Sequence, residues 1–280
     1  MPVATPPAVL VFGLFDPTGR IDIPADGVTC AAQRTHALCV PTGMAVSDTA
    51  GIDWLERANA ELVDEQARCL LEDMPVNAIK VGTVTCPETA SVIASVAADY
   101  SEAPMVLQLG PRETPHEPAD QDLDGSEVES SVGATLELLV PQAAVVVVPA
   151  GALGRWLNDE VLNNFSQTDG PAVLLALGAT WALVTGYAQR PGSLVNLLLG
   201  PEGETIALPY QPTPERVQDL SGLTTTALAC GLAHGMAVPQ AAILACDYAE
   251  QAAVHAFQCG MGRKLANRAI HAAPPTPPTP

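Results

Sequence analysis

Short apolar runs that alternate with helical segments are the feature that most constrains how this chain folds. Four runs have the length and composition of buried strands: residues 8–15, 77–81, 105–109 and 143–148. Helix signals occupy residues 87–100, 126–139, 153–165, 220–234 and 239–258. Because strands that alternate with helices pair in parallel, the sequence predicts an α/β fold with three layers, α/β/α, and a mostly parallel central sheet.

Weaker signals complete this pattern. An extended run at residues 37–46 is followed by a long amphipathic helix whose apolar face is formed by Leu55, Ala58, Leu62 and Cys69. The remaining elements are a short helix ending at 173–178, a strand at 181–184, and a hairpin whose strands are 193–199 and 204–208.

Chain length and linker content suggest how the domains are organised. A single core can grow to about 250–300 residues, and no linker interrupts the first 270 positions of this 280-residue chain. We therefore expect a flexible N-terminus at residues 1–7, a single domain over residues 8–270, and a disordered Pro-rich tail at residues 271–280. Residues 110–125 contain three prolines and several acids, and predict an exposed loop.

The charge balance excludes some partners. The formal net charge is -19, and Lys80 and Lys264 are the only lysines, whereas nucleic acids are bound through clustered basic residues. We therefore expect no nucleic-acid partner. The N-terminal apolar run is too short for a signal peptide core and no apolar stretch reaches the length of a membrane helix, so we expect a cytoplasmic protein with no membrane association.

Cysteine and histidine spacing indicates neither metal nor hydrolytic chemistry. The seven cysteines include no C-x-x-C pair, so neither a zinc site nor a disulfide framework is predicted, and we expect them to be small core residues. The five histidines lack metal-ligand spacing, and no serine lies in a nucleophile elbow. His234 is expected to end a helix, followed by Gly235.

Ligands of open parallel sheets bind beyond the carboxyl ends of the strands. The segments at those ends are residues 15–26, 46–48, 80–84, 108–111, 149–151 and 185–187, together with the helix start near Leu220. The functional side chains are therefore expected in these segments.

Three of these regions carry a family resemblance. The segment from Asp16-Pro17-Thr18-Gly19 to Ala25-Asp26, the strand Ala78-Ile79-Lys80-Val81-Gly82 and the helix at 227–235 resemble the hydroxymethylpyrimidine and phosphomethylpyrimidine kinases of thiamine synthesis, which have the ribokinase-like fold. The resemblance spans nearly the whole chain and is strongest at residues 8–109 and 219–258. It implies a homodimer and, for an active member, ATP and Mg²⁺ as cofactors.

The first loop of that family reads AGSDPSGGAGIQAD, and its backbone and last acid hold the pyrimidine. Here Asp16, Gly19 and Asp26 are retained, and the resemblance implies that Asp26 bonds the amino edge of a pyrimidine. However, Arg20-Ile21-Asp22 replaces Gly-Ala-Gly, which removes the freedom that lets backbone approach a ligand. The alternative is that Asp26 caps a helix that begins near Val28.

Two further segments bear on substrate binding. A family glutamine that reads the pyrimidine is replaced by Ser47, which offers fewer hydrogen bonds. Lys80 and Gly82 survive and are carried over as substrate-binding residues. The alternative is that Lys80 is a structural ion-pair partner, which is the simpler interpretation of a single charged residue.

The metal and nucleotide side departs further from the family. A family aspartate after the fourth strand is Gln108 here, and a Thr-Pro-Asn motif becomes Val148-Pro149-Ala150, so no metal ligands are predicted. The strand end Val-Lys-Gly-Gly is Val184-Thr185-Gly186-Tyr187, which leaves Thr185 and Gly186 on the nucleotide side without a cation.

The helix start that the family writes His-Gly-Thr-Gly-Cys-Thr reads Asp219 to Thr224 here. Leu223 occupies the position of the catalytic base and cannot accept a proton. Ser221, Gly222 and Thr224 remain as an anion hole, with Gly222 also on the nucleotide side. Asp219 beside them would repel an anion.

These observations leave three hypotheses. The first is a catalytically impaired kinase homologue that retains a small pyrimidine-like ligand or a regulatory partner. The second is an active divergent kinase that uses ATP and Mg²⁺ with substitute ligands such as Asp16, Asp22 or Asp48. The third is a structural or interaction protein with a vestigial pocket.

Overall fold

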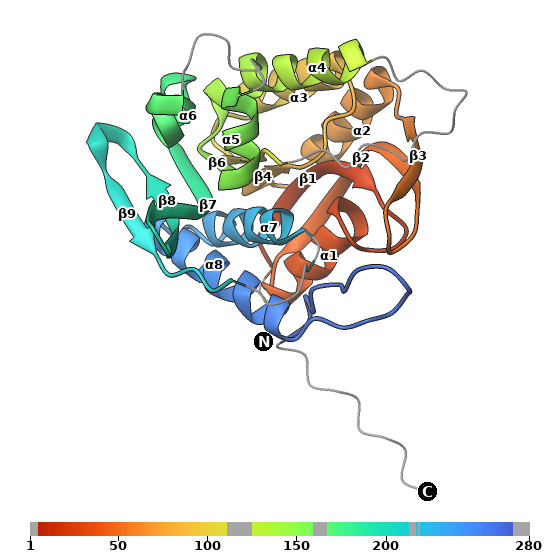
Figure 1. Ribbon diagram of the computed structural model, residues 1–280. Coiled ribbons are helices and arrows are strands. Elements are labelled where there is room, and N and C mark those ends of the chain that lie inside the picture. The colour runs from red at the N-terminus through yellow and green to blue at the C-terminus, as the bar shows by residue number, and fades with distance from the viewer. Residues whose placement is uncertain (1–4, 111–124, 159–166, 213–216, 218, 271–280) are drawn as a thin grey trace, which may run out of the picture.

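The computed structural model describes residues 5–110, 125–158, 167–212, 217 and 219–270. Within these residues a nine-stranded sheet has the order β3-β2-β1-β4-β5-β6-β7-β8-β9 (Figure 1). The strands are β1 (Ala8–Phe15), β2 (His36–Ser47), β3 (Ile52–Arg57), β4 (Ala78–Val81), β5 (Met105–Gln108), β6 (Val145–Pro149), β7 (Trp181–Arg190), β8 (Ser193–Leu199) and β9 (Thr205–Leu208). Neighbours from β2 to β7 in this order pair in parallel, whereas β3, β8 and β9 pair antiparallel. The predicted mostly parallel sheet is confirmed.

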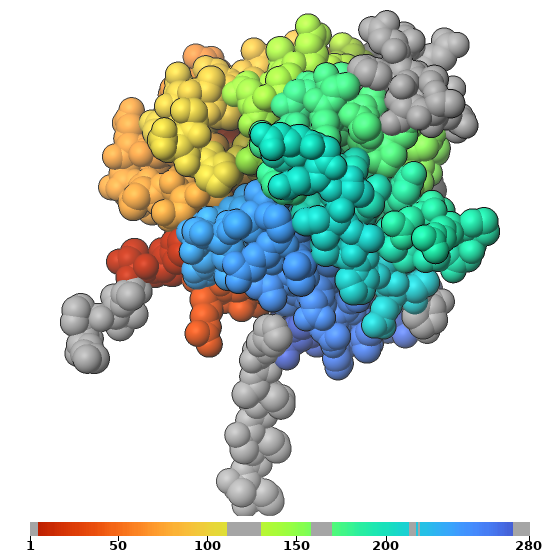
Figure 2. Space-filling model, turned by 90° about the vertical axis from the view of Figure 1, so that its left-hand side faces the viewer, coloured from red at the N-terminus to blue at the C-terminus, as the bar shows by residue number. Residues whose placement is uncertain are grey.

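Helices cover both faces of the sheet (Figure 1). One layer contains α2 (Ala60–Asp73), α3 (Pro87–Asp99), α4 (Gly125–Ala134), α5 (Ala150–Asn158) and α6 (Val173–Ala176). The other contains α1 (Asp22–Ala32), α7 (Leu220–Ala233) and α8 (Val238–Val254). On the face shown in Figure 2, the C-terminal helical region in blue lies beside the β8–β9 hairpin in cyan. The three-layer α/β/α architecture is therefore confirmed.

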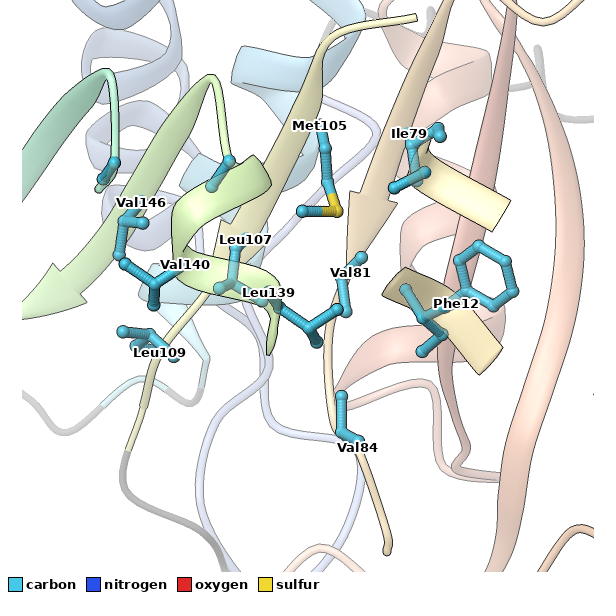
Figure 3. Close-up of a cluster of buried hydrophobic side chains, with 14 of the residues drawn as sticks. Phe12, Ile79, Val81, Val84, Met105, Leu107, Leu109, Leu139, Val140 and Val146 are labelled. Carbon is cyan, nitrogen blue, oxygen red and sulfur yellow. The ribbon is translucent and has the colours of Figure 1, made fainter. Parts of the chain in front are cut away.

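Side-chain alternation along the strands divides the core into two clusters. In β1, Phe12 packs into the cluster under α2 and α3, whereas Val11 packs into the cluster under α1, α7 and α8. Figure 3 shows the first cluster, to which Val81 and Leu107 contribute from β4 and β5. The apolar surface that these side chains remove from water is what stabilises the packing of the helices on the sheet.

The same alternation orients the lysine of β4. Ile79 and Val81 both belong to the first cluster, and successive side chains of a strand point to opposite faces of a sheet. Lys80 therefore faces the layer that contains α1 and α7, where a charged side chain must find partners within the protein.

The predicted long amphipathic helix is wrong in its first part. Residues 52–57 form strand β3, which pairs antiparallel with β2 so that Trp54 lies opposite Val46. The helix α2 begins only at Ala60, and the side chain of Asn59 caps it by accepting the amide of Glu61 at 2.8 Å. Strand pairing and a new cap thus interrupt what looked like one helical period.

This correction also changes the buried face of α2. Leu55 lies in β3, Ala58 precedes the helix, and both Leu62 and Cys69 are exposed. The fully buried residues of α2 are Val63 and Ala67. The prediction chose the wrong apolar stripe because its starting point lay in a strand.

The other elements agree with the predictions apart from their bounds, except that residues 159–165 of the helix predicted at 153–165 lie outside the described residues. The hairpin of β8 and β9 is confirmed, and β7 continues to Arg190, well beyond the predicted strand end. The helix expected to reach residue 139 instead ends at Ala134 and continues as a π-helical turn over Thr135–Leu139. Helix α7 ends at its C-cap His234, followed by Gly235, as expected.

The sequence predicted that the cysteines are core residues, and the structure confirms this for only some of them. Cys30, Cys230 and Cys246 are buried, whereas Cys69 and Cys259 are exposed. The prediction failed for the last two because they lie on helix and loop surfaces that composition alone does not locate.

No helix in the described part of the chain is both long and apolar enough to span a membrane.

Some predictions concern residues that the structure does not describe. The first four residues, nearly all of the predicted loop at 110–125, and the Pro-rich tail from 271 lie outside the described residues.

Candidate functional site

Lys80 makes two ion pairs with acids of α1. Its ammonium donates to Asp22 Oδ1 at 2.8 Å and to Asp26 Oδ2 at 2.6 Å, and all three side chains are 0–1% exposed. Asp26 lies inside α1, so the alternative role as a cap near Val28 is wrong. We call Asp22, Asp26 and Lys80 the acid–lysine cluster.

Donors within the protein also occupy the outer oxygens of this cluster. Asp22 Oδ2 accepts the backbone amides of Leu14 at 3.1 Å and Thr83 at 3.0 Å. Asp26 Oδ1 accepts the hydroxyl of Thr226, from α7, at 2.6 Å. Every carboxylate oxygen of the cluster therefore has a donor, which is the condition for burying charges at tolerable cost.

Burial and mutual attraction compete in setting the pKa values of the cluster. Burial alone would lower the pKa of Lys80, but the charges of Asp22 and Asp26 outweigh it and raise that pKa. Burial opposes ionisation of Asp22, yet the nearby ammonium and the donors around it lower its pKa overall. Burial raises the pKa of Asp26, and the neighbouring charge of Asp22 adds to the rise, although the ammonium of Lys80 opposes it. Lysine and Asp22 are therefore charged at neutral pH.

Asp22 fills space that two glycines leave open. A Cβ atom at Gly82 would lie 2.1 Å from Asp22 Oδ1 and 2.6 Å from Lys80 Nζ, and one at Gly13 would lie 2.9 Å from Asp22 Cβ. Asp22 itself has a positive φ of 39°, a conformation that costs free energy outside glycine. Gly82, predicted to bind substrate, thus makes room for the carboxylate of Asp22.

Asp16 organises the loop that precedes α1. It is fully buried and accepts the amides of Thr18 at 3.0 Å and Ile21 at 3.2 Å. It also accepts the hydroxyl of Ser47 at 2.6 Å, and the Arg20 guanidinium lies 3.6 Å away. The structure therefore brings together Asp16 and Ser47, two predicted substrate-binding residues, but bonds them to each other.

Gly19 has the local role that the sequence leads one to expect of a turn glycine. Its φ is +67°, and its amide donates to the carbonyl of Asp16 at 3.0 Å. No atom lies within 4 Å of a Cβ built at this position. A left-handed turn, rather than steric closeness to a neighbour, explains a glycine here.

A carboxylate of the protein itself caps the start of α7. Asp219 Oδ1 accepts the amide of Gly222 at 2.9 Å and the side-chain amide of Gln108 at 3.2 Å. Asp219 Oδ2 lies 3.2 Å from Nη2 of Arg268, and the Asp219 side chain is 6% exposed. The amide of Gly222, predicted to form part of an anion hole, thus already binds an anion.

Burial also changes the titration of this carboxyl group. It raises the pKa of Asp219 to about 6, although the positive charge of Arg268 opposes the rise. Asp219 also has a positive φ of 53°. A strained backbone and an ionisable group at one position are typical of functional sites, but they also occur in structural networks.

Three other candidate residues at the start of α7 have side chains that lie within the protein. Thr224 donates its hydroxyl to the carbonyl of Leu220 at 2.7 Å. Ser221 Oγ is buried without a hydrogen-bond partner among the described residues. Leu223, at the position of the family base, is fully buried in the second core cluster.

The nucleotide-side residues lie on β7. Thr185 is paired with Pro149 of β6, and Gly186 donates its amide to Asn196 Oδ1 at 3.2 Å. Gly186 has a φ of +66°, and a Cβ atom there would lie 3.3 Å from the ring of Tyr210. Gly186 is therefore required by local packing, and its amide is engaged within the hairpin.

Sequence reasoning missed Arg268, which joins three parts of the site. Its guanidinium lies 3.1 Å from the hydroxyl of Thr29 and 3.2 Å from the carbonyl of Arg20, in addition to its pairing with Asp219. Arg268 is 6% exposed. An isolated arginine after the last helix carries no pattern from which such burial could be inferred.

Comparison with known proteins identifies the family. The family model described as phosphomethylpyrimidine kinase matches residues 16–267. The chain belongs to that family. A hydroxymethylpyrimidine/phosphomethylpyrimidine kinase from Streptomyces coelicolor is 28% identical over 263 residues, which cover 93% of this chain and 94% of the relative.

Solved structures support the ribokinase-like fold of this family member. The phosphomethylpyrimidine kinase of Clostridium difficile superposes with a TM-score of 0.69 at 20% identity, covering 88% of this chain and 99% of that one. The pyridoxal kinase of Bacillus subtilis gives a TM-score of 0.77 at 16% identity, covering 95% and 98%. At these identities the likeness concerns the fold alone.

Proposed function

We propose that this family member is impaired in phosphoryl transfer and retains a ligand-binding or regulatory role related to thiamine biosynthesis. The observation that carries the proposal is that Asp219 occupies the amide of Gly222 with a carboxylate of the protein itself. A phosphate group would have to displace that carboxylate and overcome its charge. Phosphoryl transfer depends on positioning and charge neutralisation, and both are disfavoured here.

The substrate side supports the same proposal. Asp26, expected from the family to bond a pyrimidine, has one oxygen on Lys80 and the other on Thr226, and is fully buried. With no exposed surface and a protein donor on each oxygen, Asp26 is not accessible to a ligand amine in this arrangement. Binding of a small pyrimidine-like ligand would therefore use other groups or require the acid–lysine cluster to open.

The residues present do not fit a magnesium site. Asp16 and Asp22, two of the proposed substitute ligands, accept hydrogen bonds from the protein on both oxygens. In the described part of the chain, no group of three or more histidine, cysteine, aspartate or glutamate side chains could hold a metal ion. Mg²⁺ is usually bound through carboxylates and substrate phosphates, and these carboxylates are already occupied by donors of the protein.

A direct assay tests the impairment. The purified protein is incubated with ATP, Mg²⁺ and hydroxymethylpyrimidine or its phosphate, and the product is followed by mass spectrometry. We expect turnover far below the roughly 1–100 per second of ordinary kinases. Turnover within that range would contradict the proposal and favour the active divergent kinase.

Restoring family residues provides the matched control. The double variant Asp219→His, Leu223→Cys removes the internal carboxylate and supplies a group that can act as a base. We expect it to exceed the wild-type rate, whereas Leu223→Cys alone should not, because Asp219 would still occupy the Gly222 amide. Equal rates for both variants would place the impairment elsewhere.

Binding measurements separate a surviving pocket from a vestigial one. A ligand of the folded state raises apparent stability, so thermal shifts with pyrimidine and nucleotide panels report binding without turnover. We expect a shift with at least one pyrimidine. If no compound produces a shift, the third hypothesis, a structural or interaction protein, is favoured. The complete internal pairing of the acid–lysine cluster would then explain why no ligand binds there.

The resemblance also leads us to propose a cytoplasmic homodimer organised as one domain over residues 8–270. Light scattering of the purified protein measures the assembly directly. A mass of one chain, which is 29.0 kDa, would contradict the dimer.

A further inference from the structure

Two buried cysteines meet between α1 and α7. Cys30 Sγ and Cys230 Sγ are 3.7 Å apart, and the two residues are 0% and 1% exposed. Their positions differ by 200 in the sequence, so the contact exists only in the folded chain. Neither residue belongs to the site described above.

The cysteine contact continues a second contact between the same helices. Asp26 of α1 accepts the hydroxyl of Thr226 of α7 at 2.6 Å. Cys30 lies four residues after Asp26, and Cys230 lies four residues after Thr226, which is about one helical turn in each case. The two helices therefore meet at matching positions on successive turns, and this fixes how the two thiols face each other.

A threonine also contacts both cysteines. Thr35 Oγ1 lies 3.1 Å from Cys230 Sγ and donates to the carbonyl of Cys30 at 3.1 Å. A disulfide has a sulfur–sulfur bond of about 2.05 Å, so the sulfur atoms must approach by roughly 1.7 Å. A movement of this size is within reach of side-chain rotation combined with a small helix shift.

We propose that Cys30 and Cys230 are an oxidative modification site that forms a disulfide linking α1 to α7. With hydrogen peroxide as the oxidant, one thiolate attacks a peroxide oxygen and gives a sulfenic acid and hydroxide, which takes up the released proton to form water. The second thiol then displaces the sulfenic hydroxyl as water. Overall, two thiols and one peroxide give one disulfide and two waters.

The environment makes the first step slow. The hydrogen bond with Cys230 and burial both raise the pKa of the Cys30 thiol, and the thiolate is the reactive species. The reaction therefore requires α1 or α7 to open locally. Once formed, the disulfide holds Asp26 against Thr226 and keeps the acid–lysine cluster closed, whether or not the protein has kinase activity.

Peptide mapping tests the proposal. The full-length protein is treated with hydrogen peroxide, alkylated, and digested with trypsin without reduction. Cys30 is the only cysteine of the tryptic peptide 21–34, and Cys230 lies in the peptide 217–263 together with Cys246 and Cys259. We expect these two peptides to be linked, with the loss of two hydrogen atoms, and to separate on reduction.

Matched variants identify the partner of Cys30. The link should disappear in Cys230→Ser and in Cys30→Ser, and should persist in Cys246→Ser and Cys259→Ser. Persistence in Cys230→Ser would overturn the proposal, and so would sulfinic acid at Cys30 without any link. If either serine variant fails to fold, Cys30→Ala and Cys230→Ala are used in the same comparison.

A stability measurement on the wild-type protein gives a second readout. The oxidised protein should melt at a higher temperature than the reduced protein, and reduction should reverse the difference, because a cross-link constrains the unfolded chain. An oxidised protein with the linked peptides but a lower melting temperature would overturn the claim that the disulfide holds the two helices in their present arrangement.

Discussion

The acid–lysine cluster and the start of α7 bury charge in different ways. In the cluster, each oxygen of Asp22 and Asp26 has a donor from the protein, and Lys80 lies between the two acids. At α7, Asp219 is paired with Arg268, while Gln108 Oε1 and Ser221 Oγ have no partner among the described residues. We infer that the first region stabilises the fold. The second region, which keeps unpaired polar atoms, is where hydrogen bonds can rearrange.

The largest effect on stability is expected from replacing Lys80. Lys80→Met leaves Asp22 and Asp26 buried without their shared cation, and we expect the free energy of unfolding to fall by about 3–5 kcal/mol. Urea denaturation followed by circular dichroism measures the change. Lys264→Met, at the other lysine of the chain, serves as the control and should cost under about 1 kcal/mol.

A small loss in Lys80→Met would contradict a structural role for the cluster. The triple variant with Asp22→Asn and Asp26→Asn sharpens the test, because it removes the uncompensated charges. It should recover part of the stability that the single variant loses.

The second prediction concerns pH and Asp219. The folded pKa of Asp219 is about 6, above its unfolded value near 3.8, so this carboxyl adds stability that is full below the unfolded pKa and is lost as the pH rises through about 6. The stability of wild type minus that of Asp219→Asn should therefore fall between about pH 4 and pH 6, by roughly 3 kcal/mol at most.

Comparing the two proteins across pH removes the contributions of other acids. Asp22 and Asp26 are present in both and cancel in the difference, provided that the substitution leaves the cluster intact. A difference that rises with pH would show that Arg268 controls the charge of Asp219 more strongly than burial does.

The third prediction separates the threonines of α7. Thr226→Val removes the hydroxyl that donates to the buried Asp26, whose other oxygen is paired with Lys80, and should lower the free energy of unfolding by about 1.5–3 kcal/mol. Thr225→Val is the control, because Thr225 donates to the carbonyl of Ser221 at 2.7 Å and should cost about 1 kcal/mol. Equal losses in denaturant melts would mean that Asp26 is not charged in the folded protein.

The smallest expected effects come from the same change at two glycines. Gly82→Ala places a Cβ atom 2.1 Å from Asp22 Oδ1 and should destabilise by about 1–3 kcal/mol. Gly27→Ala, inside α1 and with no atom within 4 Å, should stabilise by about 0.5–1 kcal/mol. Thermal melting measures both, and losses of similar size would indicate that Asp22 moves aside.

The sequence predicted the scaffold better than the site. The strand runs at β1, β4, β5 and β6 are visible because a strand buried on both faces is continuously apolar. Strand β3 was missed because Trp54 and Leu55 are adjacent in its sequence instead of alternating with polar residues, and the run from Ile52 to Arg57 merges with the helix that follows. Local pattern does not reveal that an edge strand pairs across a turn.

Residue types at the site were identified, but their partners were not. The sequence pointed to Asp26, Lys80 and Asp219, and the ion-pair alternative for Lys80 is the one that its contacts support. It could not pair Lys80 with Asp22 or find Arg268, because these contacts depend on how distant segments pack. The alternation around Lys80 predicts the face toward which it points, but not what lies there.

The long-range contacts of Arg268 have a consequence for how the protein is made. Arg268 meets Thr29 across 239 positions, and Asp26 meets Thr226 across 200. On the ribosome, α1 and β4 are complete long before these partners emerge, so Asp26 lacks the hydroxyl of Thr226, and Asp219 lacks the guanidinium of Arg268, until those residues have been synthesised. The site is therefore completed in the last stage of folding, and nascent chains that stall before residue 268 leave Asp219 without its arginine.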